Sequence, residues 1–140
     1  MRCRLTRRIA FHARHRMTKP GWSEAEGRRR FGATADAPGH GHLYRVAVTV
    51  AGPRDPETGT VVALAALEDL LVRAVVIPLG GSDLNRALPE VAGGEAVPAC
   101  EALAVSIWRR LAPHLAGGVR LERVTVAEDD SLEAECLGPE

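Results

Sequence analysis

Histidine is the residue type whose spacing in this chain most clearly suggests chemistry. His40 and His42 alternate with glycines at the start of a segment that has the alternation of a β-strand. Residues two apart in a strand point to the same face, with Cα atoms roughly 6.5–7 Å apart, so the two imidazoles can converge on one ion. A third imidazole would complete an open metal site, in which water or substrate takes the fourth position.

The third ligand has three candidates in the sequence: His12, His15 and His114. His12 and His15 lie three residues apart, so a strand places them on opposite faces and only one can join the site. His114 stands late in an expected helix, where a cationic side chain stabilises the C-terminal end. The alternative to a metal site is that His40 and His42 are ordinary histidines at the end of a strand.

Periodicity predicts the elements that must position these histidines. Apolar residues alternate as in strands in four segments, and two others have helical spacing. A capping box at Ser23 and Glu26 predicts a further short helix. This order indicates an α+β fold, an antiparallel sheet with helices on one face. The expected strands are 5–15, 42–50, 60–63 and 119–128, the main helices 64–76 and 99–115, and the loops 32–41, 53–59 and 79–98.

Composition excludes several classes of protein. The 140 residues carry 18 Lys+Arg and 18 Asp+Glu, and this zero net charge argues against a nucleic-acid binder. No apolar run approaches the length needed to cross a membrane, and the basic N-terminus lacks the apolar stretch of a secretory signal. The length fits a single domain, 1–140. The charge is nevertheless uneven: most charged residues among the first 30 are basic, and most of those among the last 20 are acidic.

The three cysteines are odd in number, and no two have the spacing of a zinc or redox motif. We therefore expect reduced thiols and a cytoplasmic protein. Cys100, beside Glu101, is interpreted as a small residue at the start of a helix.

Six segments, in order along nearly the whole chain, carry further patterns. They are FHARHR (11–16), PGHGHLY (38–44), DPETGTVV (55–62), LN (84–85), Glu101 with Ile107-Trp108, and VTVAE (124–128). As a set they resemble the motifs of the 6-pyruvoyl-tetrahydropterin synthase and 6-carboxy-tetrahydropterin synthase family. The resemblance implies a T-fold: a four-stranded antiparallel sheet with two helices on one face. Such subunits join edge to edge into an oligomeric barrel, a trimer or a hexamer.

The resemblance also implies roles for particular residues. His15, His40 and His42 match the three zinc ligands, which selects His15 over His12. Glu128 matches the glutamate that holds the pterin ring, a role that suits a carboxylate because it accepts two parallel N–H bonds; the alternative is an exposed acid at the end of a strand. Glu101 matches an acid beside the same pocket, the alternative being a residue that only complements the helix dipole. The family's pocket lies between subunits, so Glu128 and the histidines are free to act from different chains.

Three positions depart from the family pattern. The usual catalytic cysteine, six residues before the first histidine of the HGH pair, is Thr34 here. The usual Asp-His pair after the first main helix is Gly80-Gly81. A threonine hydroxyl does not ionise as a thiol does near neutral pH, so the familiar proton relay is absent. Some relatives use an acid from the loop before the HGH pair, which makes Asp36 the candidate base, the alternative being a solvated aspartate.

The resemblance implies a zinc-dependent lyase-like enzyme that acts on the side chain of a reduced pterin, such as dihydroneopterin triphosphate. Its pathway would be that of queuosine, biopterin or folate. The alternatives are a non-catalytic homologue that binds zinc and pterin, and a zinc enzyme with an unrelated small substrate. Three imidazoles also suit other transition metals, so zinc is the expected ion and not the only chemically suitable one.

Overall fold

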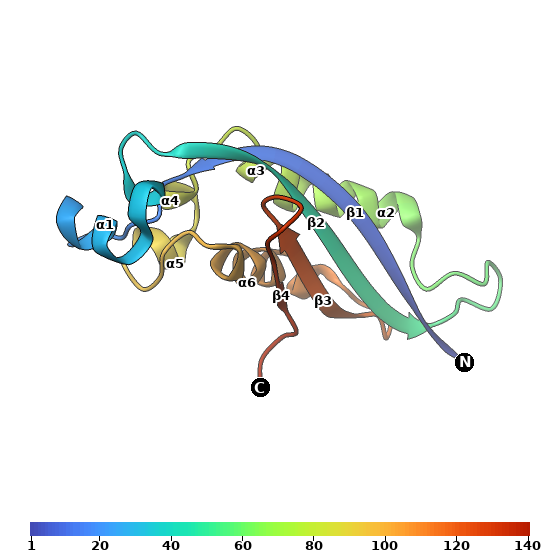
Figure 1. Cartoon of the computed structure of the whole chain (residues 1–140). Coiled ribbons are helices and arrows are strands. Elements are labelled where there is room, and N and C mark those ends of the chain that lie inside the picture. The colour runs from blue at the N-terminus through green and yellow to red at the C-terminus, as the bar shows by residue number, and fades with distance from the viewer.

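The computed structural model describes all residues, 1–140, and is organised around two long strands. β1 (Arg2–His15) and β2 (His40–Pro53) pair antiparallel along their whole length. Figure 1 shows them side by side, arching over the helices. β3 (Arg120–Ala127) pairs with β2 and β4 (Glu133–Cys136) pairs with β3, both antiparallel, so the sheet order is β1-β2-β3-β4. The α+β class and the four-stranded antiparallel sheet are confirmed.

The strand predicted at 60–63 is wrong. Those residues close a loop after β2, in which the Asp55 amide donates to the Thr60 carbonyl at 2.8 Å. The side chain of Val61 is buried against the core, which explains an apolar residue at this position without a strand. The fourth strand is β4, whose four residues are too short and too acidic to stand out as a strand in the sequence.

Two helical segments cover one face of the sheet (Figure 1). The first begins as α2 (Leu64–Leu71), passes through a π-helical turn over Val72–Val76 and ends as α3 (Ile77–Leu79). The helix predicted for 64–76 therefore continues past its expected end and includes Pro78. Proline has no N–H to bond the preceding turn, and the Ala74 carbonyl instead accepts from Arg110 Nη1 at 3.4 Å.

The second covering helix is α6 (Cys100–Leu111), extended by a 3-10 turn at Ala112–His114. Its apolar residues meet those of β2 and α2 in one core of 24 buried residues. Full burial of each large aliphatic side chain stabilises the fold by about 1.5–3 kcal/mol. The largest fully buried side chains include Tyr44, Val46, Val48, Leu71, Leu103 and Ile107.

Short helices gather at the end of the sheet where β1 ends and β2 begins. α1 (Glu24–Phe31) starts at the predicted cap, because Ser23 Oγ accepts the Glu26 amide N–H at 3.1 Å. It is followed by a 3-10 turn, Gly32–Ala35. The segment 79–98, predicted as a loop, contains α4 (Leu84–Ala87) and α5 (Pro89–Ala92).

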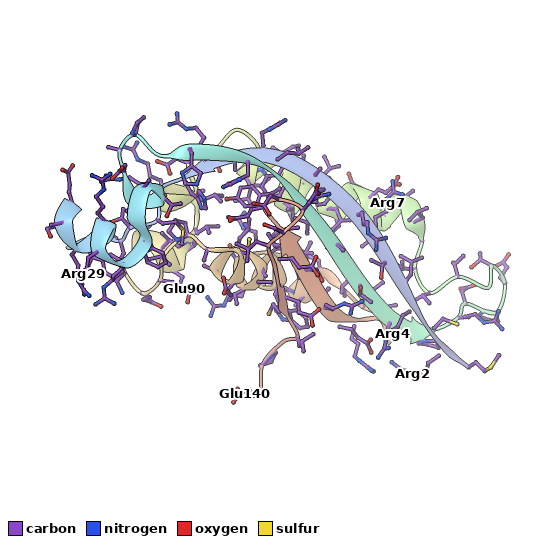
Figure 2. All side chains as sticks on the ribbon, viewed as in Figure 1. Arg2, Arg4, Arg7, Arg29, Glu90 and Glu140 are labelled. Carbon is purple, nitrogen blue, oxygen red and sulfur yellow. The ribbon has the colours of Figure 1, made fainter.

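The uneven charge is partly neutralised by ion pairs within the chain. Figure 2 labels Arg4 and Arg7, which follow one another along β1. Arg4 pairs with Glu122 of β3, and Arg7 Nη2 lies 2.5 Å from Glu68 Oε1 of α2. None of the helices has the length and apolar character that crossing a membrane requires.

Candidate metal centre and the pocket around it

The register of β1 against β2 brings three histidines together. His15 lies directly opposite His40, and Ala13 lies opposite His42, so the three imidazoles share the face that is turned toward the helices. His15 is 3% exposed, whereas His12 lies on the opposite face and is exposed. The structure thus places His15, His40 and His42 side by side and keeps His12 away from them.

The three imidazoles have the spacing of a metal site. His15 Nε2 lies 2.9 Å from His40 Nε2 and 3.2 Å from His42 Nε2. One ligand atom from each residue lies within 4.8 Å of the others. A tetrahedral zinc ion with Zn–N bonds of about 2.0–2.1 Å separates its ligands by about 3.3 Å. These three residues, which we call the histidine triad, therefore fit such an ion.

The His15 ring is oriented by two groups that contact its Nδ1 atom, on the side away from the other two histidines. Its Nδ1 lies 2.7 Å from the carbonyl oxygen of Pro98, and the Tyr44 hydroxyl is 3.2 Å from the same nitrogen. A carbonyl only accepts, so Nδ1 carries the proton and Nε2 presents its lone pair to the triad. A backbone partner of this kind is typical of histidines that hold a metal.

Burial also affects the protonation of His15 and His40. Desolvation lowers the pKa of His15 below its ordinary value, although the Pro98 carbonyl opposes the shift. Desolvation, helped by the nearby His42, likewise lowers the pKa of His40. Both rings are therefore neutral at neutral pH, and only a neutral imidazole has a lone pair for a metal.

Glu128 is the carboxylate that approaches the triad. It follows β3 directly, and its amide N–H donates to the Leu132 carbonyl at 3.2 Å in the turn that leads to β4. Its Oε2 lies 3.9 Å from His15 Nε2 and 3.8 Å from His42 Nε2. These distances are too long for hydrogen bonds, and they place a negative charge beside the triad within one and the same chain.

Cys100 lies beside Glu128, a contact that the sequence alone did not predict. Its side chain is 3% exposed, and its Sγ lies 3.9 Å from Glu128 Oε2. Burial, followed by the nearby charge of Glu128, raises the pKa of the thiol to about 12. Cys100 is therefore a neutral thiol that faces the Glu128 carboxylate. Recognising this from sequence would have required the register between α6 and the end of β3.

Glu101, the next residue, points elsewhere. It is exposed and lines a separate surface hollow with Phe31, Glu90 and Val97. Within one chain the structure therefore brings Glu128 to the triad and leaves Glu101 on the outside of α6.

Thr34 and Asp36 are both exposed, and both are engaged within their own loop. The Thr34 hydroxyl donates to the Phe31 carbonyl at 2.6 Å. Asp36 Oδ2 lies 3.3 Å from Arg28 Nη2. The structure thus ties these two side chains to α1, and neither is part of the triad.

The backbone at Gly80 and Gly81 disfavours the usual Asp-His pair, for a different reason at each position. A Cβ at Gly80 would lie 2.6 Å from the Val76 carbonyl oxygen, a separation that real Cβ atoms essentially never show. Gly81 has φ +73°, a left-handed conformation that favours glycine. Its N–H donates to the His12 carbonyl at 2.6 Å. The loop is therefore built around glycine and does not merely lack two side chains.

Comparison with known proteins gives a consistent picture over the whole chain. The family model described as 6-pyruvoyl tetrahydropterin synthase matches residues 4–139. The chain is 39% identical to a human protein named 6-pyruvoyl tetrahydrobiopterin synthase over 127 residues, which are 91% of this chain and 86% of that protein. It is 34% identical over 135 residues to the Drosophila melanogaster protein of the same name, covering 96% of this chain and 79% of that one.

Solved structures agree on the fold. A Caenorhabditis elegans 6-pyruvoyl tetrahydropterin synthase superposes with a TM-score of 0.89 at 24% identity, covering 99% of this chain and 97% of that one. A Plasmodium vivax 6-pyruvoyltetrahydropterin synthase superposes with a TM-score of 0.69 at 16% identity, covering 97% of each chain. The T-fold expected from the motifs is confirmed.

Proposed function

Because the chain belongs to the 6-pyruvoyl tetrahydropterin synthase family, we propose that it is a zinc-dependent lyase acting on the side chain of a reduced pterin. The substrate is dihydroneopterin triphosphate or a closely related pterin. One observation supports this most strongly: three imidazoles and one carboxylate lie side by side within one chain.

The triad is the place where the metal would be held. His15, His40 and His42 are three of the four ligands of an open zinc site, and the remaining position is left for substrate. Zinc bound there would act as a Lewis acid toward the side-chain oxygens of the substrate, lowering the pKa of a hydroxyl. The strands β1 and β2 supply all three ligands, so the site is fixed by sheet register and not by a loop.

Glu128 has two oxygens with different surroundings. Oε2 faces the triad and the thiol of Cys100, which leaves Oε1 to accept an N–H from the pterin ring. The carboxylate is thereby placed between the ring and the metal-bound side chain. We propose that Glu128 binds the ring and also accepts the proton that the reaction removes.

Asp36 is less well placed for that proton step. Its carboxylate pairs with Arg28, and a loop shift that breaks this pair would be needed to bring it to the triad. Thr34, at the usual cysteine position, donates to a backbone carbonyl and keeps its proton there. In this chain the proton step is therefore assigned to Glu128, which directly follows β3.

The assembly we propose is a homo-oligomer, a trimer or a hexamer, built from the single domain 1–140. β1 is 14 residues long and lies at an edge of the sheet. Near its end, His12 and Arg14 bond to the segment 81–82, so the outer side of the backbone before them is available to pair with another copy. In such a ring the exposed Glu101 would reach a pocket of a neighbouring subunit. We expect the protein in the cytoplasm, acting on a small molecule and not on nucleic acid.

The test is a metal assay followed by incubation with dihydroneopterin triphosphate and identification of the product by mass. We expect zinc near one per chain and conversion of the pterin. Protein that carries zinc and binds the pterin in calorimetry without converting it would instead be the non-catalytic homologue, which the loss of the family's Cys and Asp-His residues makes the second candidate. Bound zinc without pterin binding would support the third candidate, a zinc enzyme that acts on another small substrate.

A further inference from the structure

The two free edges of the sheet carry opposite charges. β1 and β4 are the outermost strands in the order β1-β2-β3-β4. β1 begins RCRLTRR and has no acidic residue, whereas β4 reads EAEC and has no basic one. Because antiparallel strands alternate in direction across this sheet, β4 of one copy can pair antiparallel with β1 of the next. The opposite charges of the two strands would then attract across the ladder.

Hydrogen bonds at the end of β1 show which of its residues turn their backbone toward the free edge. The Arg14 N–H donates to the Ser82 carbonyl at 2.9 Å, and the His12 carbonyl accepts the Gly81 N–H at 2.6 Å. Backbone groups alternate between the two sides of a strand, so the even-numbered residues of β1 face the edge. The segment 81–82 covers the edge at its far end, and the even positions within 2–10 are left for another chain.

The same alternation identifies the outward residues of β4. The Glu128 N–H donates to the Leu132 carbonyl at 3.2 Å, just before β4 begins. Bonded pairs recur every second residue along an antiparallel ladder. Cys136 therefore turns its N–H and C=O toward β3, and Glu133 and Glu135 turn theirs toward the free edge.

Each edge strand also carries one cysteine on the face that packs against the helices. Cys3 and Cys136 are both partly exposed, and both contact the hydrophobic core. Neither turns its backbone groups toward the free edge, so the two residues would form a non-hydrogen-bonded pair if they lay opposite each other. The Cα atoms of such a pair are about 4.5 Å apart, which is within the range of roughly 4.4–6.8 Å that a disulfide bond spans.

The closure of a ring decides which residue of β1 lies opposite Cys136. Within one chain, Cys136 shares a row across the sheet with Val124, Val48 and Arg7. Strands in a closed barrel are tilted, so this row meets β1 of the next copy at a residue shifted along the strand. A total stagger equal to the number of strands tilts them by about 36°. With four strands per copy, the shift from one copy to the next is then about four residues.

Only one direction of that shift leads to a free part of the edge. Four residues from Arg7 lie Cys3 toward the N-terminus and Phe11 toward the C-terminus. Pairing at Phe11 would need the outward backbone groups of His12, whose carbonyl already accepts the Gly81 N–H. The shift toward the N-terminus meets no such obstacle, and it places Cys3 opposite Cys136 of the next copy.

The neighbouring pairs of this register are also favourable. On the outer face, Glu135 comes to lie opposite Arg4 of the next copy, and opposite charges in facing positions stabilise a sheet. Arg4 also pairs with Glu122 of its own β3, so the two glutamates would share one guanidinium. On the helix-covered face, Ala134 comes to lie opposite Leu5, and both of these side chains already pack against the core.

We propose that Cys3 of one copy and Cys136 of the next form a disulfide bond across the β1–β4 seam when the thiols are oxidised. The proposal rests on the edge-to-edge assembly proposed above and not on the lyase chemistry. The step is a thiol–disulfide exchange: a small disulfide such as oxidised glutathione takes up the two electrons and two protons and leaves as two thiols, while one S–S bond joins the copies. In a reducing compartment both thiols stay free, and the ladder alone holds the seam.

Oxidation of the full chain tests the bond. The protein is incubated with oxidised glutathione, its remaining thiols are blocked with N-ethylmaleimide, and the chains are separated by non-reducing electrophoresis. Each copy uses Cys3 on one side and Cys136 on the other, so we expect cross-linked dimers and closed trimers that a reductant returns to single chains. Peptide mass mapping should find Cys3 linked to Cys136. Cys3→Ser and Cys136→Ser should each lower the cross-linked fraction at least about tenfold.

The register has its own control, Leu5→Cys made in the Cys3→Ser protein. This thiol lies on the same face of β1 but two residues further along, a distance of roughly 6.5–7 Å. It is then out of disulfide reach of Cys136, so it should not restore the cross-link. Cross-linking through Leu5→Cys in place of Cys3 would overturn the proposed register, and so would cross-linked chains in either single serine variant.

Light scattering on the reduced protein separates the remaining outcomes. An oligomer that forms no cross-link would overturn the bond and leave the assembly intact, whereas a monomer would overturn both. Pterin conversion is measured on the same reduced protein. Cross-linking of Cys3 to Cys136 in a protein that converts no pterin would sustain the bond and reject the lyase function.

Discussion

The two sides of the pocket differ in what holds their side chains. On one side, His15, His40 and His42 stand on the paired strands β1 and β2. Glu128 follows β3, and Cys100 opens α6. These groups are buried or half-buried, and they face one another.

On the other side, the positions that usually carry the acid–base groups lie in loops. Thr34 and Asp36 are exposed and bond to α1 or to the turn after it. Gly80 and Gly81 have no side chains, and the backbone at Gly80 excludes one. We call these two groups the strand side and the loop side.

The difference indicates which part of the site is free to change. Moving one histidine of the strand side would require a change of register across 14 paired residues of each strand, which would turn every side chain of the strand to the other face. The loop side can change through local backbone shifts. We therefore expect metal and ring binding to depend on the strand side, and the loop side to tolerate substitution.

The largest effect is expected from the triad. His42→Ala should abolish zinc binding and lower turnover by roughly three orders of magnitude, because the metal supplies several kcal/mol of stabilisation to the developing charge. Zinc analysis and product detection measure both. His12→Ala, on the exposed face of β1, is the control and should leave both unchanged. Retention of zinc in the His42 variant would show that the ion is bound elsewhere.

The second largest effect is expected at Glu128. Glu128→Gln keeps the shape and removes the charge, so it should lower kcat/KM by roughly 10²–10⁴ while zinc content stays the same. Glu133→Gln, an exposed acid on β4, is the control. If Glu128 only binds the ring, KM alone will rise. If kcat falls as well, the same carboxylate also moves a proton, as proposed, and an unchanged kcat would contradict this.

The rate at which the Cys100 thiol is alkylated tests whether the strand side is closed to solvent. Its burial and its pKa near 12 leave almost no thiolate at pH 8, and thiolate is the reactive form. We expect iodoacetamide to label Cys100 more than about tenfold slower than the partly exposed Cys3 and Cys136, as read by peptide mass mapping. Raising the pH toward 12 should increase the rate, because more of the thiol ionises. Labelling of Cys100 as fast as that of Cys3 at pH 8 would mean that the pocket is open and the thiol ionised.

The smallest effect is expected from the loop side. Asp36→Asn should change kcat less than about twofold, since the carboxylate is exposed and is paired with Arg28 on the surface. Thr34→Ala should behave in the same way. A hundredfold loss of kcat in the Asp36 variant, with zinc intact, would show that the loop moves during the reaction and would return the base to Asp36.

The spacing of the histidines predicts part of the triad because that information is local. The two-residue spacing places His40 and His42 on one face, and the odd separation of His12 from His15 admits only one of them. The choice of His15 came from the family resemblance, and the register of β1 against β2 places His15 beside the other two. The main helices and three of the four strands were recognisable for the same reason. β4 was missed because it is short and acidic, and 60–63 was mistaken for a strand because burial alone explains its apolar residues.

The rest of the pocket depends on contacts between distant segments. Glu128 and Cys100 meet across 28 residues, and their approach depends on how α6 packs on the sheet. The loop at Gly80 and Gly81 is held against β1 by the hydrogen bond from Gly81 to His12 and by the bridge between Arg14 and Asp83. Neither arrangement has a period or a motif in the sequence.

The most direct test of the proposed function is to incubate zinc-loaded protein with dihydroneopterin triphosphate and identify the product by mass. A pterin whose side chain has been cleaved or rearranged, formed by the unaltered protein and not by His42→Ala, is the expected result. An unchanged substrate, in a protein shown to contain one zinc per chain, would contradict the lyase function.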